Sequence, residues 1–158
     1  MRPIDKSSPQ ATPAVTVAIG ASGYTTQVNT RGHTLQTDEP ESVGGMNAGP
    51  TPYELLVAAI GSCVAMTLRV YADRKGWPLT GVVVGLNQNR VHAQDCSDCE
   101  SISGLVLRIT KQIELQGDLD DEQRSRLIEV ADRCPVQRSL FSEIQIKTEL
   151  MVEGPHPA

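Results

Sequence analysis

Hydrophobic and polar positions alternate in several short stretches of this chain, a pattern typical of β-strands with one buried face. The stretches predicted as strands are 15–19, 24–30, 33–37, 82–91, 104–115 and 144–152. Small residues and glycine separate the first three, which predicts a hairpin followed by a third strand. The polar segment 92–101 joins the fourth and fifth strands.

A long helix is predicted between the third and fourth strands, with a clear start signal. Thr51 is a favourable N-cap, Pro52 suits the first helical position, and Glu54 completes a capping box. The helix is expected to run to about Lys75, where Gly76 ends it. Between positions 55 and 66 the only polar side chain is that of a serine, so the helix is expected to be buried all round. One small domain can hardly surround such a helix, which predicts that a second subunit helps to cover it.

A second amphipathic helix is predicted after the fifth strand. Three acidic residues at 120–122 suit its first turn, because the helix dipole favours negative charge there. Leu127, Ala131 and Cys134 follow at helical spacing, so the Cys134 side chain is expected to face the core. Pro135 is expected to end this helix. Antiparallel strand pairs and two helices together predict an α+β fold.

Composition narrows the function classes. The 158 residues carry a net charge of -5, with a pI near 5.1, and only 3% are aromatic, which argues against a nucleic-acid partner. Residues 1–13 are polar and proline-rich, so we expect a flexible tail rather than a signal peptide, followed by one domain over 14–153. No segment is expected to approach the roughly 20 apolar residues that span a bilayer. These features predict a cytoplasmic protein with no membrane partner.

Two cysteines are the chemical candidates. Taken alone, Cys63 in the long helix is most simply a buried, inert thiol. It lies about three turns from the helix start, too far for the helix dipole to lower its pKa much. Its activation would need a neighbouring cation, or hydrogen-bond donors from elsewhere in the fold.

The segment GPTPYELLVAAIGSC that ends at Cys63, together with ADRCP around Cys134, resembles the OsmC/Ohr family of osmotically inducible and organic hydroperoxide resistance proteins. The resemblance implies antiparallel sheets that wrap long central helices in an intertwined homodimer. It also implies that Cys63 attacks an organic hydroperoxide and becomes a sulfenic acid. Cys134 then forms a disulfide with it, which a cellular dithiol reduces. No cofactor and no metal are implied.

The chain departs from the organic hydroperoxide resistance branch at one position. Members of that branch carry an arginine at the tip of the first hairpin, where this chain has Ala21-Ser22-Gly23. Arg31 in the next turn is the candidate substitute, and Arg133 and Arg138 lie nearer Cys134 in the sequence. Members of that branch also pair the arginine with a glutamate at the start of the long helix. Glu54 is close to that position, although its capping role explains the same carboxylate. The chain therefore resembles the broader OsmC-like branch.

Alternatives to peroxidase activity come from two features. A chain of this fold without the arginine could bind a small apolar or thiol-reactive ligand without turnover. His92, Cys96 and Cys99 form an H-x3-C-x2-C pattern in one loop, which could hold a metal or act as a redox sensor. A zinc site normally takes four ligands, so a polar loop with two thiols or a local disulfide is the simpler interpretation.

Overall fold

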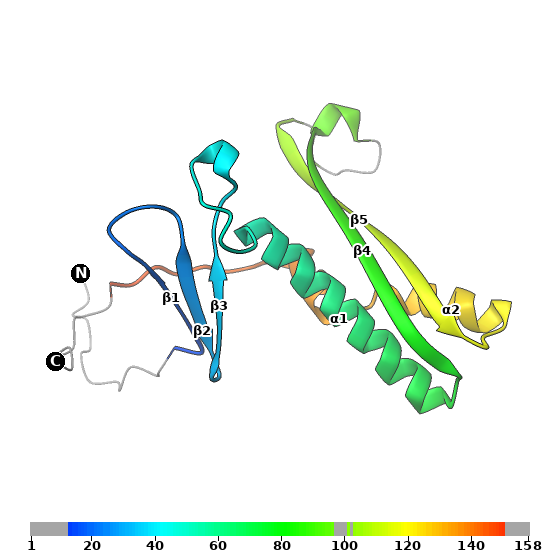
Figure 1. Ribbon diagram of the computed structural model, residues 1–158. Coiled ribbons are helices and arrows are strands. Elements are labelled where there is room, and N and C mark those ends of the chain that lie inside the picture. The colour runs from blue at the N-terminus through cyan, green and yellow to red at the C-terminus, as the bar shows by residue number, and fades with distance from the viewer. Residues whose placement is uncertain (1–12, 97–100, 102, 151–158) are drawn as a thin grey trace, which may run out of the picture. The chain divides into compact units, whose positions relative to one another are not determined.

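A computed structural model describes residues 13–96, 101 and 103–150 (Figure 1). The chain divides into two compact units, residues 1–56 and residues 57–158. The predicted flexible tail falls almost wholly outside the described residues. The prediction of a single domain over 14–153 stays a prediction.

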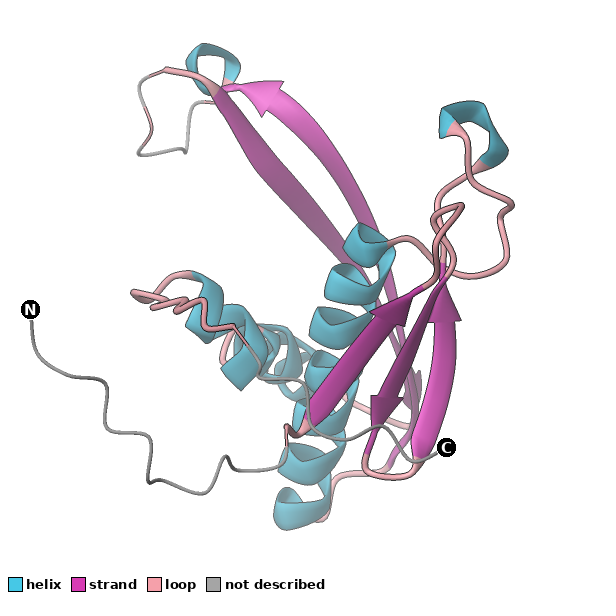
Figure 2. Cartoon of the chain, turned by 90° about the vertical axis from the view of Figure 1, so that its left-hand side faces the viewer, coloured by secondary structure: helices cyan, strands magenta, loops and turns pink. Residues whose placement is uncertain are grey.

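The first unit contains a three-stranded antiparallel sheet in the order β1-β2-β3. Its strands are β1 (Val15–Ile19), β2 (Thr26–Thr30) and β3 (His33–Thr37), as predicted except that β2 begins two residues later; Figure 2 shows them as three neighbouring arrows. Arg31 and Gly32 connect β2 to β3 with φ values of 46° and 81°. Glycine adopts such a conformation without steric cost, which suits a tight turn.

The connection from β3 to the long helix is organised around a buried carboxylate. Asp38 is 2% exposed, and its oxygens accept hydrogen bonds from the Thr25 hydroxyl and from the backbone N–H groups of Glu39, Met46 and Ala48. Burial raises the pKa of Asp38, but these donors lower it more, so its net pKa lies below the usual value. The 3-10 helix η1 (Glu41–Val43) lies within this connection.

The long helix α1 (Pro52–Lys75) has the predicted bounds and the predicted capping box. The Thr51 backbone N–H donates to Glu54 Oε2 at 2.7 Å, and the Glu54 N–H donates to Thr51 Oγ1 at 3.2 Å. Its buried residues are Ile60, Gly61, Val64, Leu68 and Ala72, which fall on one face. The opposite face is exposed in the single chain, with Met66 67% and Val70 48% exposed. The expectation of burial all round therefore does not hold for one chain.

The composition of α1 corrects the expectation that no segment is long and apolar enough to span a bilayer. An 18-residue window of this helix has a mean hydropathy of 1.8, so by length and composition it could cross a membrane. The statement that no segment approaches this length was wrong, because Gly61, Ser62 and Thr67 interrupt the apolar run without adding charge. Central helices of water-soluble folds pass the same test, and α1 has one face packed into a protein core.

A long antiparallel hairpin forms the other side of that core. It pairs β4 (Leu79–His92) with β5 (Leu105–Gly117), slightly longer than the strands predicted. Apolar side chains of both strands, among them Val84, Leu86, Ile109 and Ile113, pack against the core that contains the buried residues of α1. A Cβ on Gly61 would lie 2.6 Å from Leu86 Cδ1, so glycine permits this close approach of helix and strand.

The chain after β5 differs from the prediction at its helix boundaries. Helix α2 (Asp121–Ala131) begins with a capping box between Asp120 and Gln123, and it buries Leu127, Val130 and Ala131. It ends at Ala131, three residues before the predicted end at Cys134. Pro135 does not end this helix; it is the first residue of the short helix α3 (Pro135–Leu140), with Cys134 as the N-cap. Proline fixes φ near the helical value and lacks only an N–H that the first turn leaves unpaired, so it starts a helix well.

The predicted final strand is not formed in the described residues. Positions 143–150 are irregular and exposed, and Ile144, Ile146 and Leu150 are 55%, 86% and 93% exposed. Alternation shows which residues would share a face if the segment were paired, but a strand also needs a neighbour for its backbone hydrogen bonds. The described chain supplies none to this segment. Residues 151 and 152 of the prediction lie outside the described residues.

Candidate functional site

The structure brings Cys63 and Cys134 together in the unit formed by residues 57–158. Cys63 lies in the middle of α1, and Cys134 lies in the turn between α2 and α3. Both are free thiols; Cys134 is fully buried, whereas Cys63 is half-buried and packs against the core. Leu127, Ala131 and Cys134 are all buried in that core, as predicted, although Cys134 lies beyond the end of α2 and not on its helical face.

Hydrogen-bond donors hold the pKa of Cys63 below its usual value. Burial alone would raise this pKa, because it disfavours the thiolate. The Cys134 thiol, the Val136 backbone N–H and the Thr67 hydroxyl lower it more. All three groups are neutral, so donors from elsewhere in the fold, rather than a cation, favour the thiolate.

The fold explains why the Val136 N–H is available. Helix α3 starts at Pro135, which has no N–H, so Val136 carries the first N–H of this helix. The first N–H groups of a helix have no partner within the helix. This donor is fixed by the backbone, whereas a thiol and a hydroxyl can rotate.

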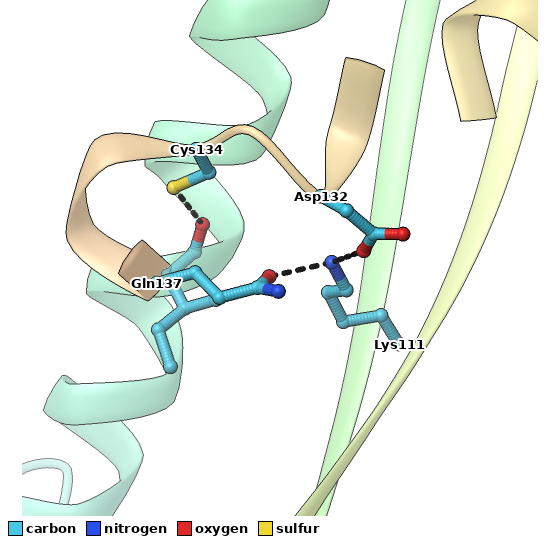
Figure 3. Close-up of polar contacts among 5 residues, drawn as sticks. Lys111, Asp132, Cys134 and Gln137 are labelled. Atoms are coloured by element: carbon cyan, nitrogen blue, oxygen red, sulfur yellow. Dashed lines mark hydrogen bonds and ion pairs between the residues drawn. The ribbon is translucent and has the colours of Figure 1, made fainter. Parts of the chain in front are cut away.

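The other two donors have alternative acceptors. Thr67 Oγ1 donates to the Cys63 carbonyl oxygen at 2.7 Å. Cys134 Sγ lies 3.9 Å from the Ile60 carbonyl oxygen, a long and weak contact (Figure 3). A charged acceptor binds a donor more strongly than a neutral carbonyl does. The Cys134 thiol therefore donates a stronger hydrogen bond to the Cys63 thiolate than to the Ile60 carbonyl oxygen.

The pKa of Cys134 moves in the opposite direction. Burial raises it most, and the hydrogen bond to Cys63 raises it further, because the neutral thiol is the donor. The Gln137 and Val136 N–H groups offset only part of this rise. The pair is therefore asymmetric: Cys63 is the thiol that ionises first, and Cys134 is its protonated partner.

Cys63 opens into an apolar cavity of about 690 Å³. The lining residues are Ala59, Ser62, Cys63, Met66, Thr67, Val70, Tyr71, Arg74, Val130, Arg133, Pro135 and Val136. Most of the lining comes from one face of α1, and two guanidinium groups supply its positive charge. Such a cavity can accept an apolar molecule of moderate size with one end at the thiol.

A model of the OsmC-like protein family matches residues 45–149, a range that contains both cysteines. The chain belongs to the OsmC family. Comparison with curated proteins gives no match. The family assignment thus rests on two thirds of the sequence and agrees with the resemblance in the two cysteine motifs.

Solved structures of OsmC-like proteins share the fold. A Psychrobacter arcticus protein, named as an osmotic stress induced and detoxification response protein, matches with a TM-score of 0.66 and 18% identity, over 82% of this chain and 89% of that one. An OsmC-like protein of Mycoplasma pneumoniae gives a TM-score of 0.64 and 16% identity, over 84% and 89%. An organic hydroperoxide resistance protein of Legionella pneumophila gives 0.58 and 18%, over 84% and 91%. At these identities the likeness shows a common fold, which confirms the predicted α+β class.

The other two predicted site residues belong to the unit formed by residues 1–56. The Glu54 carboxylate accepts the Thr51 N–H in the capping box, so its observed contact is structural. Arg31 is exposed in the turn between β2 and β3. Their catalytic roles stay predictions.

The H-x3-C-x2-C loop is described only in part. Cys96 is buried and disulfide-bonded rather than a free thiol, and Cys99 lies outside the described residues. His92 is the last residue of β4 and is exposed. Among residues 13–96, 101 and 103–150, no three His, Cys, Asp or Glu side chains lie close enough to hold a metal.

Sequence reasoning missed several residues around Cys63 in this OsmC-like chain. Thr67, Val70 and Arg74 follow Cys63 at intervals of four, seven and eleven, so helical spacing could have placed them on its face. No sequence signal for the Val136 N–H was available as long as Pro135 was expected to end a helix. Once Pro135 is placed at a helix start, that donor follows.

Proposed function

We propose that this OsmC-family protein is a cysteine-based peroxidase that reduces organic hydroperoxides. The observation that carries the proposal is the asymmetric thiol pair: Cys63, whose pKa is lowered and which lines an apolar cavity, lies beside Cys134, whose pKa is raised. A thiolate is the form that attacks peroxides, and an apolar cavity suits a peroxide with a hydrocarbon substituent. The names of related structures, which include organic hydroperoxide resistance proteins, agree with this activity.

In the proposed first step, the Cys63 thiolate attacks the terminal oxygen of the hydroperoxide. The O–O bond breaks, the sulfur becomes a sulfenic acid, and the organic group leaves as an alkoxide. The Cys134 thiol no longer has a thiolate acceptor at this point, so it can give its proton to the alkoxide. This transfer releases an alcohol and leaves Cys134 as a thiolate.

In the second step, the Cys134 thiolate attacks the Cys63 sulfur, a disulfide forms, and the hydroxyl leaves as water after it gains a proton. A dithiol reductant then attacks the disulfide and restores both thiols while it becomes a disulfide itself. Each cycle thus converts one hydroperoxide and one dithiol into an alcohol, water and one disulfide.

We also propose that the active form is a cytoplasmic homodimer. The exposed face of α1 includes Met66 and Val70, which line the cavity with Cys63. A second copy on that face would remove apolar surface from water and close the cavity. The exposed segment 143–150 retains a strand pattern, and a second copy could supply its missing neighbour.

Peroxide consumption by three proteins tests the activity. With cumene hydroperoxide and an excess of a dithiol such as dihydrolipoamide, the parent should turn over continuously. Cys63→Ser should consume no peroxide. Without the dithiol, Cys134→Ser should consume about one equivalent and accumulate the sulfenic acid, which a dimedone adduct at Cys63 would show. If the parent consumes no more peroxide than Cys63→Ser, the peroxidase proposal is wrong and non-catalytic binding of a ligand in the cavity takes its place.

A further inference from the structure

Lys111 occupies an unexpected position on β5. The residues two before and two after it, Ile109 and Ile113, pack against the core, so position 111 lies in the core-facing row of the strand. Its side chain is only 16% exposed. A lysine in such a place needs partners for its charge, because burial of an unpaired ammonium is unfavourable.

Both partners of Lys111 belong to the turn that carries Cys134. Its Nζ lies 2.9 Å from Asp132 Oδ1 and 2.6 Å from Gln137 Oε1 (Figure 3). Asp132 is the C-cap of α2, and Gln137 lies in the first turn of α3. The two contacts therefore hold both ends of the segment 132–137 to the same point on β5.

Two of the donors to Cys63 lie inside this segment. The Cys134 thiol and the Val136 N–H come from its middle, whereas the third donor, the Thr67 hydroxyl, comes from α1 itself. The direction of the first two donors depends on how the turn is held above α1. The turn has no ladder of backbone hydrogen bonds to a strand, so core packing of Cys134 and side-chain contacts such as those of Lys111 fix its position.

We propose that Lys111 is a positioning residue for the reactive thiol: by binding Asp132 and Gln137 it holds the 132–137 turn so that Cys134 and Val136 point at Cys63. Lys111 does not contact Cys63 and takes no part in bond making. The inference deepens the proposed peroxidase function, but it concerns the state of the thiol and can be tested without peroxide.

The test is the pH dependence of Cys63 alkylation by iodoacetamide, followed by mass spectrometry of the peptide that contains Cys63. Lys111→Met keeps the length of the side chain and removes its charge and donors. Its alkylation midpoint should rise by about one pH unit, the shift expected when roughly one hydrogen bond to the thiolate is lost. At a pH below both midpoints, alkylation should be roughly tenfold slower than in the parent, because the rate follows the thiolate fraction.

Three further variants separate positioning from a general effect of charge or folding. Gln137→Leu removes only the acceptor on α3 and should shift the midpoint in the same direction. Lys111→Arg keeps a cation that can reach both acceptors and should move the midpoint back toward the parent value. Arg108→Met removes a charge from the exposed face of the same strand and should leave the midpoint unchanged. The charged or titratable side chains that line the cavity with Cys63, namely those of Tyr71, Arg74 and Arg133, are the same in all of these proteins.

The outcomes are decisive in both directions. Lys111→Met should remain folded, since replacing a buried charge by an apolar side chain is often neutral for stability, and Asp132 is 70% exposed to water. If Lys111→Met does not fold, Gln137→Leu decides alone. A parent-like midpoint in folded Lys111→Met or in Gln137→Leu, or an equal shift in Arg108→Met, would overturn the proposal. If the parent does not turn over peroxide, the peroxidase proposal is wrong, but a shifted alkylation midpoint in Lys111→Met would still support the positioning role of Lys111.

Discussion

The hydrogen bond from Cys134 to Cys63 leads to a quantitative prediction for Cys134→Ala. This change removes one of the three donors that lower the pKa of Cys63 and leaves Val136 and Thr67 in place. A hydrogen bond to a charged group contributes about 1.5–3 kcal/mol, and a thiol is a weak donor, so the lower end applies. About 1.4 kcal/mol corresponds to one pKa unit. The pKa of Cys63 should therefore rise by about one unit in the alanine variant.

Cys134→Ser is the matched control, because its hydroxyl can still donate to the thiolate. Its Cys63 pKa should lie closer to that of the parent than to that of Cys134→Ala. The assay is the rate of Cys63 alkylation from pH 5 to about 10, a range that spans the ordinary thiol pKa. At the acidic end the alanine variant should react about tenfold more slowly than the parent. An alanine variant with the same midpoint as the parent would refute the role of Cys134 as a donor.

Three other predictions follow from the fold. Asp38 has a lowered pKa, so its ionised form stabilises the folded state above the unfolded pKa of about 3.8, and this stabilisation is lost as the pH falls through the lower folded pKa. In urea denaturation, Asp38→Asn should therefore be less stable than the parent at pH 7, and the difference between the two should shrink at pH 3. Leu127 is fully buried, so Leu127→Ala should lower the free energy of unfolding by about 2–5 kcal/mol, whereas Ile128→Ala, at a side chain that is 47% exposed, should cost clearly less; equal costs would contradict the assigned core. Sedimentation at micromolar concentration should give twice the chain mass of 17.0 kDa, and a stable folded monomer would rule out the dimer.

Local signals explain why parts of the fold could be predicted from the sequence. The start of α1 is determined by neighbours in the chain, since Thr51, Pro52 and Glu54 build the capping box by themselves. The strands β1 to β5 could be predicted because each pairs with a strand adjacent in the sequence, across a turn or loop. The pairing of Cys63 with Cys134 was expected because both side chains were placed in one core.

The errors occur where the outcome depends on distant or absent partners. The segment 144–152 has the alternation of a strand, but alternation does not say which strand would pair with it. At Cys134-Pro135 the sequence allowed a helix to end or a new one to begin, and only the packed turn distinguishes these. Lys111 carried a signal that was overlooked: a lysine within an alternating apolar stretch indicates that a partner will be found inside the fold. Its two partners, Asp132 and Gln137, lie 21 and 26 residues further along the chain, so they could not be identified from the strand itself.

The most direct test of the central claim is the product of one equivalent of cumene hydroperoxide added to the reduced protein in the absence of any reductant. The account predicts one equivalent of the corresponding alcohol and an intramolecular disulfide between Cys63 and Cys134, identified by mass spectrometry of the non-reduced digest. Recovery of unreacted peroxide with both thiols still reduced would contradict it.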